Sequence, residues 1–316
     1  HELMEQGSNL PQVESNHRSL VQPCNLDDNW AHVEWFLTTA ARRTHCSRPT
    51  NGFHRMTRFS PEGTAYRLEG AAHLPPVVLC HGVGLDLHMW EAQVNALLGR
   101  FHILRYDMLG HGETSAQPGV TGIGAFSQQL FSLLKYLEMG PVSLVGFSMG
   151  GVTAQHFALQ HPTLLRQLVL MNTVYRRTAD ELAGVRARLE LTEKEGLTPI
   201  ADAAVRRWFE PTFVKKNPQI IATIRRRLLS NDVGGYLTAY RVFVNADDEI
   251  GDGLNQVTCP TLVLTGELDP GSTPQIAQRM ITDLKNGQLI VFDNLRHMAP
   301  VEDPDRINTA LLSFLK

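Results

Sequence analysis

The chain has 316 residues, of which 43% are hydrophobic and 19% are charged, and its formal net charge at pH 7 is -3. This length allows one large domain with a deep core, and the near-neutral charge excludes the strongly basic surfaces that bind nucleic acid or anionic membranes. No apolar run approaches the roughly 20 residues of a membrane span and no secretory signal pattern begins the chain, so we expect a cytoplasmic protein.

The first 52 residues are polar and weakly patterned. Within them, Asp27–Arg43 carries Trp30, Val33 and Leu37 at helical spacing, after aspartates that can cap a helix. This pattern predicts one helix inside a loosely attached arm, residues 1–52.

From Phe53 onward, short apolar runs bounded by turn residues alternate with amphipathic stretches. The predicted strands are Thr64–Gly70, Pro75–Cys80, Phe101–Asp107, Val142–Gly146, Leu165–Thr173, Pro260–Gly266 and Gln288–Asn294. The predicted helices are Trp90–Leu98, Gly124–Met139, the segment after Ser148, Thr273–Leu284 and Asp305–Leu315. Because hairpins cannot join parallel neighbours, this alternation predicts a mainly parallel sheet flanked by helices, with active groups at the carboxyl ends of its strands.

The alternation stops between residues 175 and 254, where the sequence is helical in character and lacks buried-strand runs. We therefore predict a helical cap over residues 175–254, inserted into a core formed by residues 53–174 and 255–316. The cap would lie across the carboxyl ends of the strands.

The stretch Val142–Leu159 places one serine between an apolar strand and a helix, in the spacing G-x-S-x-G. A strand that turns directly into a helix strains the backbone of its corner residue, and flanking glycines such as Gly146 and Gly150 remove the side chains that would clash. A lone G-x-S-x-G also occurs in ordinary turns. Here the preceding strand and the following helix, whose positive end favours negative charge, indicate a nucleophile at Ser148.

A serine hydroxyl is a weak nucleophile at neutral pH, so it requires a base and an acid that orients the base. The candidate base is His297, in the loop after the last predicted strand. The candidate acid is Asp269, which follows the strand before it. Glu267 and Asp293 are alternative acids.

Acyl transfer also requires donors for the oxyanion of a tetrahedral intermediate, usually backbone amides. The candidates are the amide of Met149, directly after the serine, and that of Val83, in the turn after Pro75–Cys80. We expect His81, which opens this turn, to hold the loop through hydrogen bonds rather than to take part in the chemistry. The candidate substrate-binding residues are Gly82, Gly84, Phe147 and Trp90.

Five motifs, taken together and in this order, make residues 53–316 similar to the α/β-hydrolase superfamily. They are HGVG, YDMLGHGETS, GFSMGG, GELDPGSTP and RHMAPVEDP. The resemblance implies the α/β-hydrolase fold with an eight-stranded sheet, a cap domain, and a catalytic triad in the order Ser148, Asp269 and His297. It also implies a loop that shapes the site without doing chemistry, formed by Asp107, Gly110, His111 and Gly112.

Within the superfamily the chain most resembles 3-oxoadipate enol-lactonase-like hydrolases, which cleave small esters and lactones. Carbon-carbon bond hydrolases of aromatic degradation typically carry an aromatic residue after the catalytic histidine and an asparagine before the serine, where this chain has Met298 and Phe147. Haloalkane dehalogenases and epoxide hydrolases use aspartate as nucleophile, which Ser148 excludes. The N-terminal arm has no counterpart in the compact enol-lactonases.

Cofactors are not indicated by any motif. The sequence contains neither a dinucleotide fingerprint nor a phosphate loop, and His156 and His161 fall on different helix faces, so no metal site is predicted. The spacing of the cysteines favours reduced thiols over a disulfide framework. They are Cys24, Cys46, Cys80 and Cys259.

These observations predict a cofactor-independent serine hydrolase that cleaves a small carboxylic ester or lactone through an acyl-enzyme, as a monomer or homodimer. One alternative is cleavage of a carbon-carbon or amide bond in a ring-derived catabolite by the same triad. Another is a small-molecule receptor built on a hydrolase scaffold.

The predicted cap has a local basic excess, with thirteen Arg and Lys against eight Asp and Glu from Arg176 to Arg241. A basic cleft would attract a carboxylate-bearing substrate. Solvated helix faces, on which Arg and Glu lie three or four residues apart, would give the same composition. The cap aromatics would either line a pocket or pack the cap onto the core; they are Trp208, Phe209, Phe213 and Tyr236.

Overall fold

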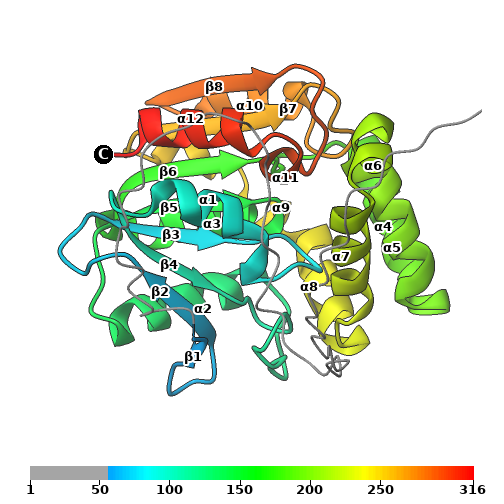
Figure 1. The fold of residues 1–316 in the computed structure, drawn as a ribbon, viewed down its shortest axis with the longest axis horizontal. Helices are drawn as coiled ribbons and strands as arrows, with labels where there is room; N and C mark the ends of the chain where they lie inside the picture. Colours follow the sequence, from blue (N-terminus) through cyan, green and yellow to red (C-terminus); the bar gives the residue numbers. More distant parts are fainter. Residues whose placement is uncertain (1–55) are drawn as a thin grey trace, which may run out of the picture. The chain divides into compact units, whose positions relative to one another are not determined.

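An eight-stranded sheet with helices on both faces forms the core of the structure (Figure 1). This computed structural model describes residues 56–316, so the predicted arm over residues 1–52, with Cys24 and Cys46, lies outside the described residues. The spatial strand order is β1-β2-β4-β3-β5-β6-β7-β8, and β2 is antiparallel to both its neighbours. All pairs from β4 to β8 are parallel, which confirms the predicted mainly parallel α/β sheet.

The strands are β1 (Arg58–Phe59), β2 (Ala65–Glu69), β3 (Pro76–Cys80), β4 (His102–Tyr106), β5 (Val142–Phe147), β6 (Leu165–Met171), β7 (Thr261–Gly266) and β8 (Gly287–Phe292). The helices around the sheet are η1 (Leu87–Trp90), α1 (Glu91–Leu97), α2 (Ile123–Tyr136), α3 (Met149–Gln160), η2 (Pro162–Leu164), α10 (Pro274–Asp283), α11 (Ala299–Glu302) and α12 (Pro304–Phe314). Each predicted strand corresponds to an observed one. The sequence does not predict β1, because two residues are too few to show an alternating pattern.

Successive residues of the central strands contribute to two different apolar cores. In β3, Val78 packs in the core that includes side chains of α2, α3 and α10, whereas Val77 and Leu79 pack in the core that includes α1 and α12. In β5, Leu144 and Val145 divide in the same way. Because both faces of these strands are buried, their sequences are continuous apolar runs, which is why the runs predict strands so well.

The chain between β6 and β7 is helical. Its helices are α4 (Ala179–Glu195), α5 (Leu197–Trp208), α6 (Pro211–Lys216), α7 (Pro218–Leu229), α8 (Val233–Asn245), α9 (Asp247–Ile250) and η3 (Gly253–Gln256). Figure 1 shows α4 to α8 beside the carboxyl ends of the parallel strands. We call α4 to α8 the cap helices. The described residues form one compact unit, so a separate cap domain with boundaries at residues 175 and 254 stays a prediction.

Further features of the described residues concern membrane-spanning helices, metal-binding groups and disulfides. Among their helices, none is long and apolar enough to cross a membrane. They contain no group of three or more His, Cys, Asp or Glu side chains that could hold a metal ion. Cys80 is buried and Cys259 half-buried, and both thiols are free.

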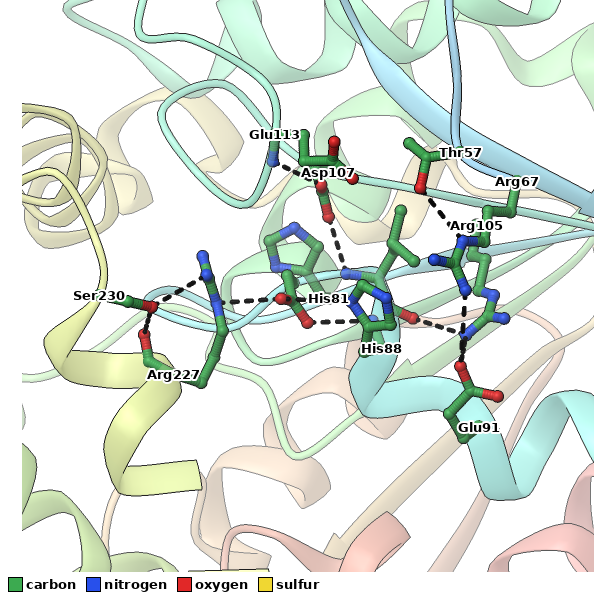
Figure 2. A network of polar contacts seen from close by, with 12 residues as sticks. Thr57, Arg67, His81, His88, Glu91, Arg105, Asp107, Glu113, Arg227 and Ser230 are labelled. Atoms are coloured by element: carbon green, nitrogen blue, oxygen red, sulfur yellow. Dashed lines mark hydrogen bonds and ion pairs between the residues drawn. The ribbon is translucent and has the colours of Figure 1, made fainter. Parts of the chain in front are cut away.

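A buried ion pair links the antiparallel strand β2 to the parallel part of the sheet. The guanidinium of Arg105 on β4 is 1% exposed and donates to Glu69 Oε1 on β2 at 2.5 and 3.0 Å. It also donates to Glu91 Oε1 at 2.8 Å and to the carbonyl of Leu87 at 3.1 Å, at the start of α1 (Figure 2). One cation therefore joins two strands and a helix at the edge of the core.

Replacing this cation by an apolar residue is expected to destabilise the fold strongly. In Arg105→Leu, Glu69 would keep a buried carboxylate without its cation, which costs about 3–5 kcal/mol in free energy of unfolding. The measurement is urea denaturation at pH 7. Arg241→Leu is the control, because the Arg241–Glu193 pair is exposed and such pairs contribute about 1 kcal/mol or less. Equal losses in the two variants would contradict this account of Arg105.

Candidate active site

Ser148 occupies a strained corner between β5 and α3, with φ 54° and ψ -118°. Such angles are unfavourable for a residue with a side chain and persist only where the surroundings enforce them. Added Cβ atoms on Gly146 and Gly150 would each lie 2.3 Å from a backbone carbonyl oxygen, so side chains cannot flank the serine. The Ser148 carbonyl accepts a hydrogen bond from the Thr173 hydroxyl at 2.6 Å, which holds the corner in place.

The structure brings together the serine, histidine and aspartate that the sequence predicts. His297 Nε2 lies 3.2 Å from Ser148 Oγ, and His297 Nδ1 lies 2.7 Å from Asp269 Oδ2. Because a carboxylate only accepts hydrogen bonds, Nδ1 carries the hydrogen and Nε2 is left to accept the serine proton. This arrangement matches the geometry of an activated nucleophile.

The two alternative acids lie elsewhere. The Glu267 carboxylate accepts a hydrogen bond from the Asn294 amide at 3.2 Å. Asp293 forms an exposed ion pair with Arg306. Of these three carboxylates, Asp269 is the one that contacts the imidazole of His297.

Asp269 is buried, and its carboxylate is fully hydrogen-bonded. Its Oδ2 also accepts from Asn172 Nδ2 at 2.9 Å, and its Oδ1 accepts from the amides of Gly271 and Ser272, both at 2.9 Å. Burial raises the pKa of Asp269, but the facing His297 and these hydrogen bonds outweigh burial and hold the pKa below its ordinary value. The carboxylate therefore stays ionised beside the imidazole.

Asn172 is a site residue that the sequence analysis missed. It directly follows β6, has a positive φ of 45°, and donates from its side chain to Asp269 and to the Arg296 carbonyl at 3.3 Å. The only available signal was its position, because a polar residue at the end of β6 adjoins the end of β7, where the acid lies. Asn172 thus connects the acid to the loop that carries His297.

Aromatic side chains support the imidazole of His297. Its ring centroid lies 5.0 Å from that of Phe147 and 5.9 Å from that of Trp208 on α5. Phe147 in turn contacts Trp90 edge-on, with 6.4 Å between ring centroids. Phe147 and Trp90 are 1% and 0% exposed, so both are packed in the core. Neither lines the cavity described below, although the sequence suggested them as substrate-binding residues.

His81 holds the turn that follows β3, which agrees with its expected structural role. Its Nε2 accepts a hydrogen bond from the Met108 amide at 3.0 Å, so Nδ1 carries the hydrogen and donates to the Gly82 carbonyl at 2.8 Å. Burial lowers the pKa of His81 to about 3 and keeps the ring neutral. The hydrogen bonds of this histidine are therefore used for backbone geometry.

The glycines of the same turn permit close packing of the turn against neighbouring side chains. A Cβ on Gly82 would lie 2.9 Å from the Phe147 ring and 3.1 Å from Ser148 Cβ. A Cβ on Gly84, whose φ is 77°, would lie 2.8 Å from a methyl group of Leu228 on α7. Both glycines lie outside the cavity lining among the described residues. The small size of Gly82 lets the turn pack against Ser148, and that of Gly84 lets it pack against the cap.

The two predicted oxyanion donors lie in this region. Val83 lines the same cavity as Ser148 and His297, and Met149 is the first residue of α3. Within the described part of the chain, neither amide donates to an acceptor of the protein. Both amides are therefore free to donate to a ligand, and their oxyanion role stays a prediction.

Residues at the end of cap helix α7 bind the turn that follows β3 (Figure 2). Arg227 on α7 forms an ion pair with Asp86 at 3.1 Å. The side chain of Asn231 donates to the Gly84 carbonyl at 2.9 Å. The position of the turn therefore depends on the end of α7 as well as on the core.

The loop formed by Asp107, Gly110, His111 and Gly112 supports the same turn. Asp107 accepts hydrogen bonds from the amides of Leu87 and Glu113, each at 2.8 Å, and a Cβ on Gly112 would overlap its carboxylate. A Cβ on Gly110 would lie 3.0 Å from Gly235 Cα, because α8 meets the loop backbone to backbone. These contacts agree with the shaping role that the sequence motif implies.

A cavity of about 220 Å³ adjoins the serine. Val83, Ser148, Asp269 and His297 form its base, and cap side chains form much of its wall, including Arg188, Arg207, Trp208, Tyr236 and Tyr240. A larger surface groove of about 940 Å³ lies along β8 and α12, but none of the predicted site residues lines it. The smaller cavity is the candidate active site, and its volume, below the roughly 300–1,000 Å³ of typical ligand pockets, favours a small substrate.

Known proteins are similar to this chain in sequence and in fold. Residues 77–310 match the Alpha/beta hydrolase family. The chain is 34% identical to (E)-2-((N-methylformamido)methylene)succinate hydrolase of Acinetobacter baylyi, over 76% of this chain and 90% of that protein. It is 29% identical to 3-oxoadipate enol-lactonase 2 of the same organism, over 79% and 92%. The enol-lactonase structure from Burkholderia xenovorans LB400 superposes with a TM-score of 0.74 at 27% identity, covering 80% of this chain and 96% of that chain.

Removing the side-chain amide of Asn172 is expected to lower the reactivity of Ser148. A hydrogen bond to a charged group contributes about 1.5–3 kcal/mol, so Asn172→Leu should slow the labelling of Ser148 by diisopropyl fluorophosphate about tenfold or more. Mass spectrometry of the intact protein measures the rate. Asn286→Leu, whose side chain is exposed and bonds the Thr258 carbonyl, should react as the wild type does. Equal rates in both variants would show that Asn172 does not position the acid.

The buried imidazole of His111 is expected to make the stability of the fold depend on pH under acidic conditions. Burial is the main cause that lowers the pKa of His111 to about 4, so below pH 6.5 the unfolded chain takes up a proton that the folded chain does not. The stability that the neutral, buried imidazole of His111 contributes to the fold is fully present above pH 6.5 and is lost as the pH falls towards 4. His81 acts in the same direction, whereas Asp107, whose pKa burial raises to about 6, acts in the opposite one.

His111→Gln should therefore reduce the slope of unfolding free energy against pH by about 1.4 kcal/mol per pH unit near pH 5. Urea denaturation between pH 5 and 8 measures this slope. Near pH 8 the histidine is neutral in both states, so the variant should there differ from the wild type by a constant amount. An unchanged slope near pH 5 would contradict the neutral, buried state of His111.

Proposed function

The chain belongs to the Alpha/beta hydrolase family, and we propose that it is a cofactor-independent serine hydrolase that cleaves a small carboxylic ester or lactone. The observation that carries this proposal is the hydrogen-bonded series from Asp269 through His297 to Ser148, next to a small cavity. A hydroxyl backed by a base and an acid suits attack on a carbonyl carbon.

In the proposed mechanism, Ser148 Oγ attacks the substrate carbonyl and gives its proton to His297 Nε2. Asp269 stabilises the imidazolium that forms, because its carboxylate stays ionised. The amides of Val83 and Met149 donate to the oxyanion of the tetrahedral intermediate, and such donors typically contribute about 10²–10³ in rate. Collapse of the intermediate breaks the bond to the leaving oxygen, which takes the proton from His297.

The acyl-enzyme is then hydrolysed by the reverse use of the same groups. His297 accepts a proton from water, and the resulting hydroxide attacks the acyl carbon attached to Ser148 Oγ. A second tetrahedral intermediate collapses and returns the proton to the serine. The product acid leaves, and no cofactor is consumed in either half of the cycle.

The known relatives support this class of reaction. A 3-oxoadipate enol-lactonase acts on a lactone, which is a cyclic ester, and the chain covers 92% of that relative. The cap side chains restrict the volume of the cavity, which favours a small substrate. The enol-lactonase relative and the small cavity therefore both support a small ester or lactone as the substrate.

A second candidate is cleavage of a carbon-nitrogen bond. The relative with 34% identity is named for a succinate that bears a formamido group, which is an amide. The same triad could attack an amide carbonyl, with His297 protonating the departing nitrogen. A substrate panel of lactones, esters and N-acyl compounds on the same carbon skeletons separates the candidates by their kcat/KM values.

Removal of the nucleophile tests the proposal directly. Ser148→Ala should lower the turnover of p-nitrophenyl acetate about 10³-fold or more, since it removes the attacking oxygen. The release of p-nitrophenolate is followed by absorbance, and Ser313→Ala, at an exposed position on α12, is the control with the same atom removed. Turnover by Ser148→Ala at the wild-type rate would end the assignment of Ser148 as nucleophile.

A further inference from the structure

Two arginines of the cap line the cavity that holds Ser148. Arg188 comes from α4 and Arg207 from α5, and both are half-buried. Arg188 Nε donates to the hydroxyl of Tyr240 on α8 at 2.9 Å, which fixes its orientation. The wall of the cavity that holds Ser148 and His297 therefore carries two guanidinium groups.

Arg207 forms no ion pair with the part of the chain that the structure describes. Within residues 56–316 its guanidinium makes neither an ion pair nor a hydrogen bond. Its immediate neighbour Arg206 is by contrast exposed. Burial first, and then the like charge of Arg188, lower the pKa of Arg207, which means that the protein holds this cation at a cost.

Among the described residues, the carboxylates around the cavity form no ion pair with Arg207, although Asp269 favours its charge from a distance. Asp269 is occupied by His297 and Asn172. Glu181 pairs with Arg279 at 2.7 Å and caps the start of α4. Asp180 is exposed to solvent. A half-buried cation without a directly paired anion, next to a second cation in a small cavity, is the arrangement expected of an anion-binding site.

We propose that Arg207, together with Arg188, binds a carboxylate group of the substrate in this cavity. The inference rests on the proposed function, because it takes the bond cleaved at Ser148 as that of an ester or lactone. A guanidinium donates two parallel hydrogen bonds to a carboxylate, so it fixes orientation as well as charge. The substrate class is thus a small ester or lactone that also carries a free carboxylate.

The cavity volume limits the distance between the two ends of this substrate. Arg207 and Ser148 line one space of about 220 Å³, so only a short carbon chain separates the carboxylate from the scissile carbonyl. Binding energy gained at Arg207 would place the carbonyl beside the serine, which is the use that enzymes make of groups remote from the reaction. Monoesters of short dicarboxylic acids are therefore suitable probes.

The test compares anionic esters with neutral ones of the same length. The pairs are monoethyl succinate with ethyl butyrate, monoethyl glutarate with ethyl pentanoate, and monoethyl adipate with ethyl hexanoate, assayed by pH-stat titration. For the wild type we expect kcat/KM of at least one anionic ester to exceed that of its neutral partner by about 30-fold or more, the usual contribution of a desolvated charge pair.

Variants assign this preference to Arg207. Arg207→Gln should bring the ratio of the two kcat/KM values close to one, and Arg207→Lys should give an intermediate ratio, because it keeps the charge without the planar fork. Arg206→Gln removes the same charge from the adjacent, exposed position and should keep the wild-type ratio. Thermal denaturation checks the folding of each variant. A ratio that Arg207→Gln and Arg207→Lys leave unchanged would overturn the proposal.

A binding experiment separates this proposal from the proposed function. Calorimetry measures binding of glutarate dianion to Ser148→Ala, with the neutral glutaramide as control. If no ester is turned over but glutarate binds and Arg207→Gln abolishes its binding, the proposed reaction is wrong and the carboxylate site stands. If esters are turned over while both the ratio and glutarate binding ignore Arg207, the carboxylate site is wrong and the proposed function stands.

Discussion

The passage of the chain from β5 directly into α3 is the constraint on which the site depends. It places Ser148 in strained backbone angles that a residue with a side chain adopts only where the surrounding structure enforces them. Gly146 and Gly150 make the corner sterically feasible, and the hydrogen bond from Thr173 holds it. As a result the hydroxyl projects at the sheet edge where the other parallel strands also end, and the loops after β7 and β8 can bring an acid and a base to it.

The acid and the base are held with different kinds of support. Asp269 is surrounded by hydrogen-bond donors, so its charge persists in a buried place. His297 lies between the aromatic rings of Phe147 and Trp208, which restrict the ring without competing for its nitrogen atoms. Such division of roles keeps both nitrogen atoms of the imidazole available, one for the carboxylate and one for the serine.

Much of this could be predicted from the sequence, because the relevant signals are local. Strands buried on both faces are continuous apolar runs, and the corner at Ser148 requires glycines at fixed spacing. Asn172 escaped prediction because its partner Asp269 is distant in the chain, and nothing in the stretch MNT announces that contact. The lack of a partner for Arg207 was equally invisible, since composition shows how many charges the cap has but not which ones are paired. Phe147 and Trp90 were predicted to bind substrate, but their packing leaves them outside the cavity lining, with Phe147 against His297 and Trp90 against Phe147.

The attachment of the cap has a consequence for the amide of Val83. At α7 and α8 the cap is tied to the core through Asn231 and Gly84, and through the backbone contact between Gly235 and Gly110. A hinge that lifted these helices would pull the Gly84 carbonyl, and with it the neighbouring amide of Val83, out of place. Helix α4 is joined to α10 by the pair between Glu181 and Arg279, and to α8 by the hydrogen bond from Arg188 to Tyr240 and the pair between Glu193 and Arg241. The end of α7 and the start of α8 therefore act as a structural support for the proposed oxyanion donor, so that the cap and the core together define its position.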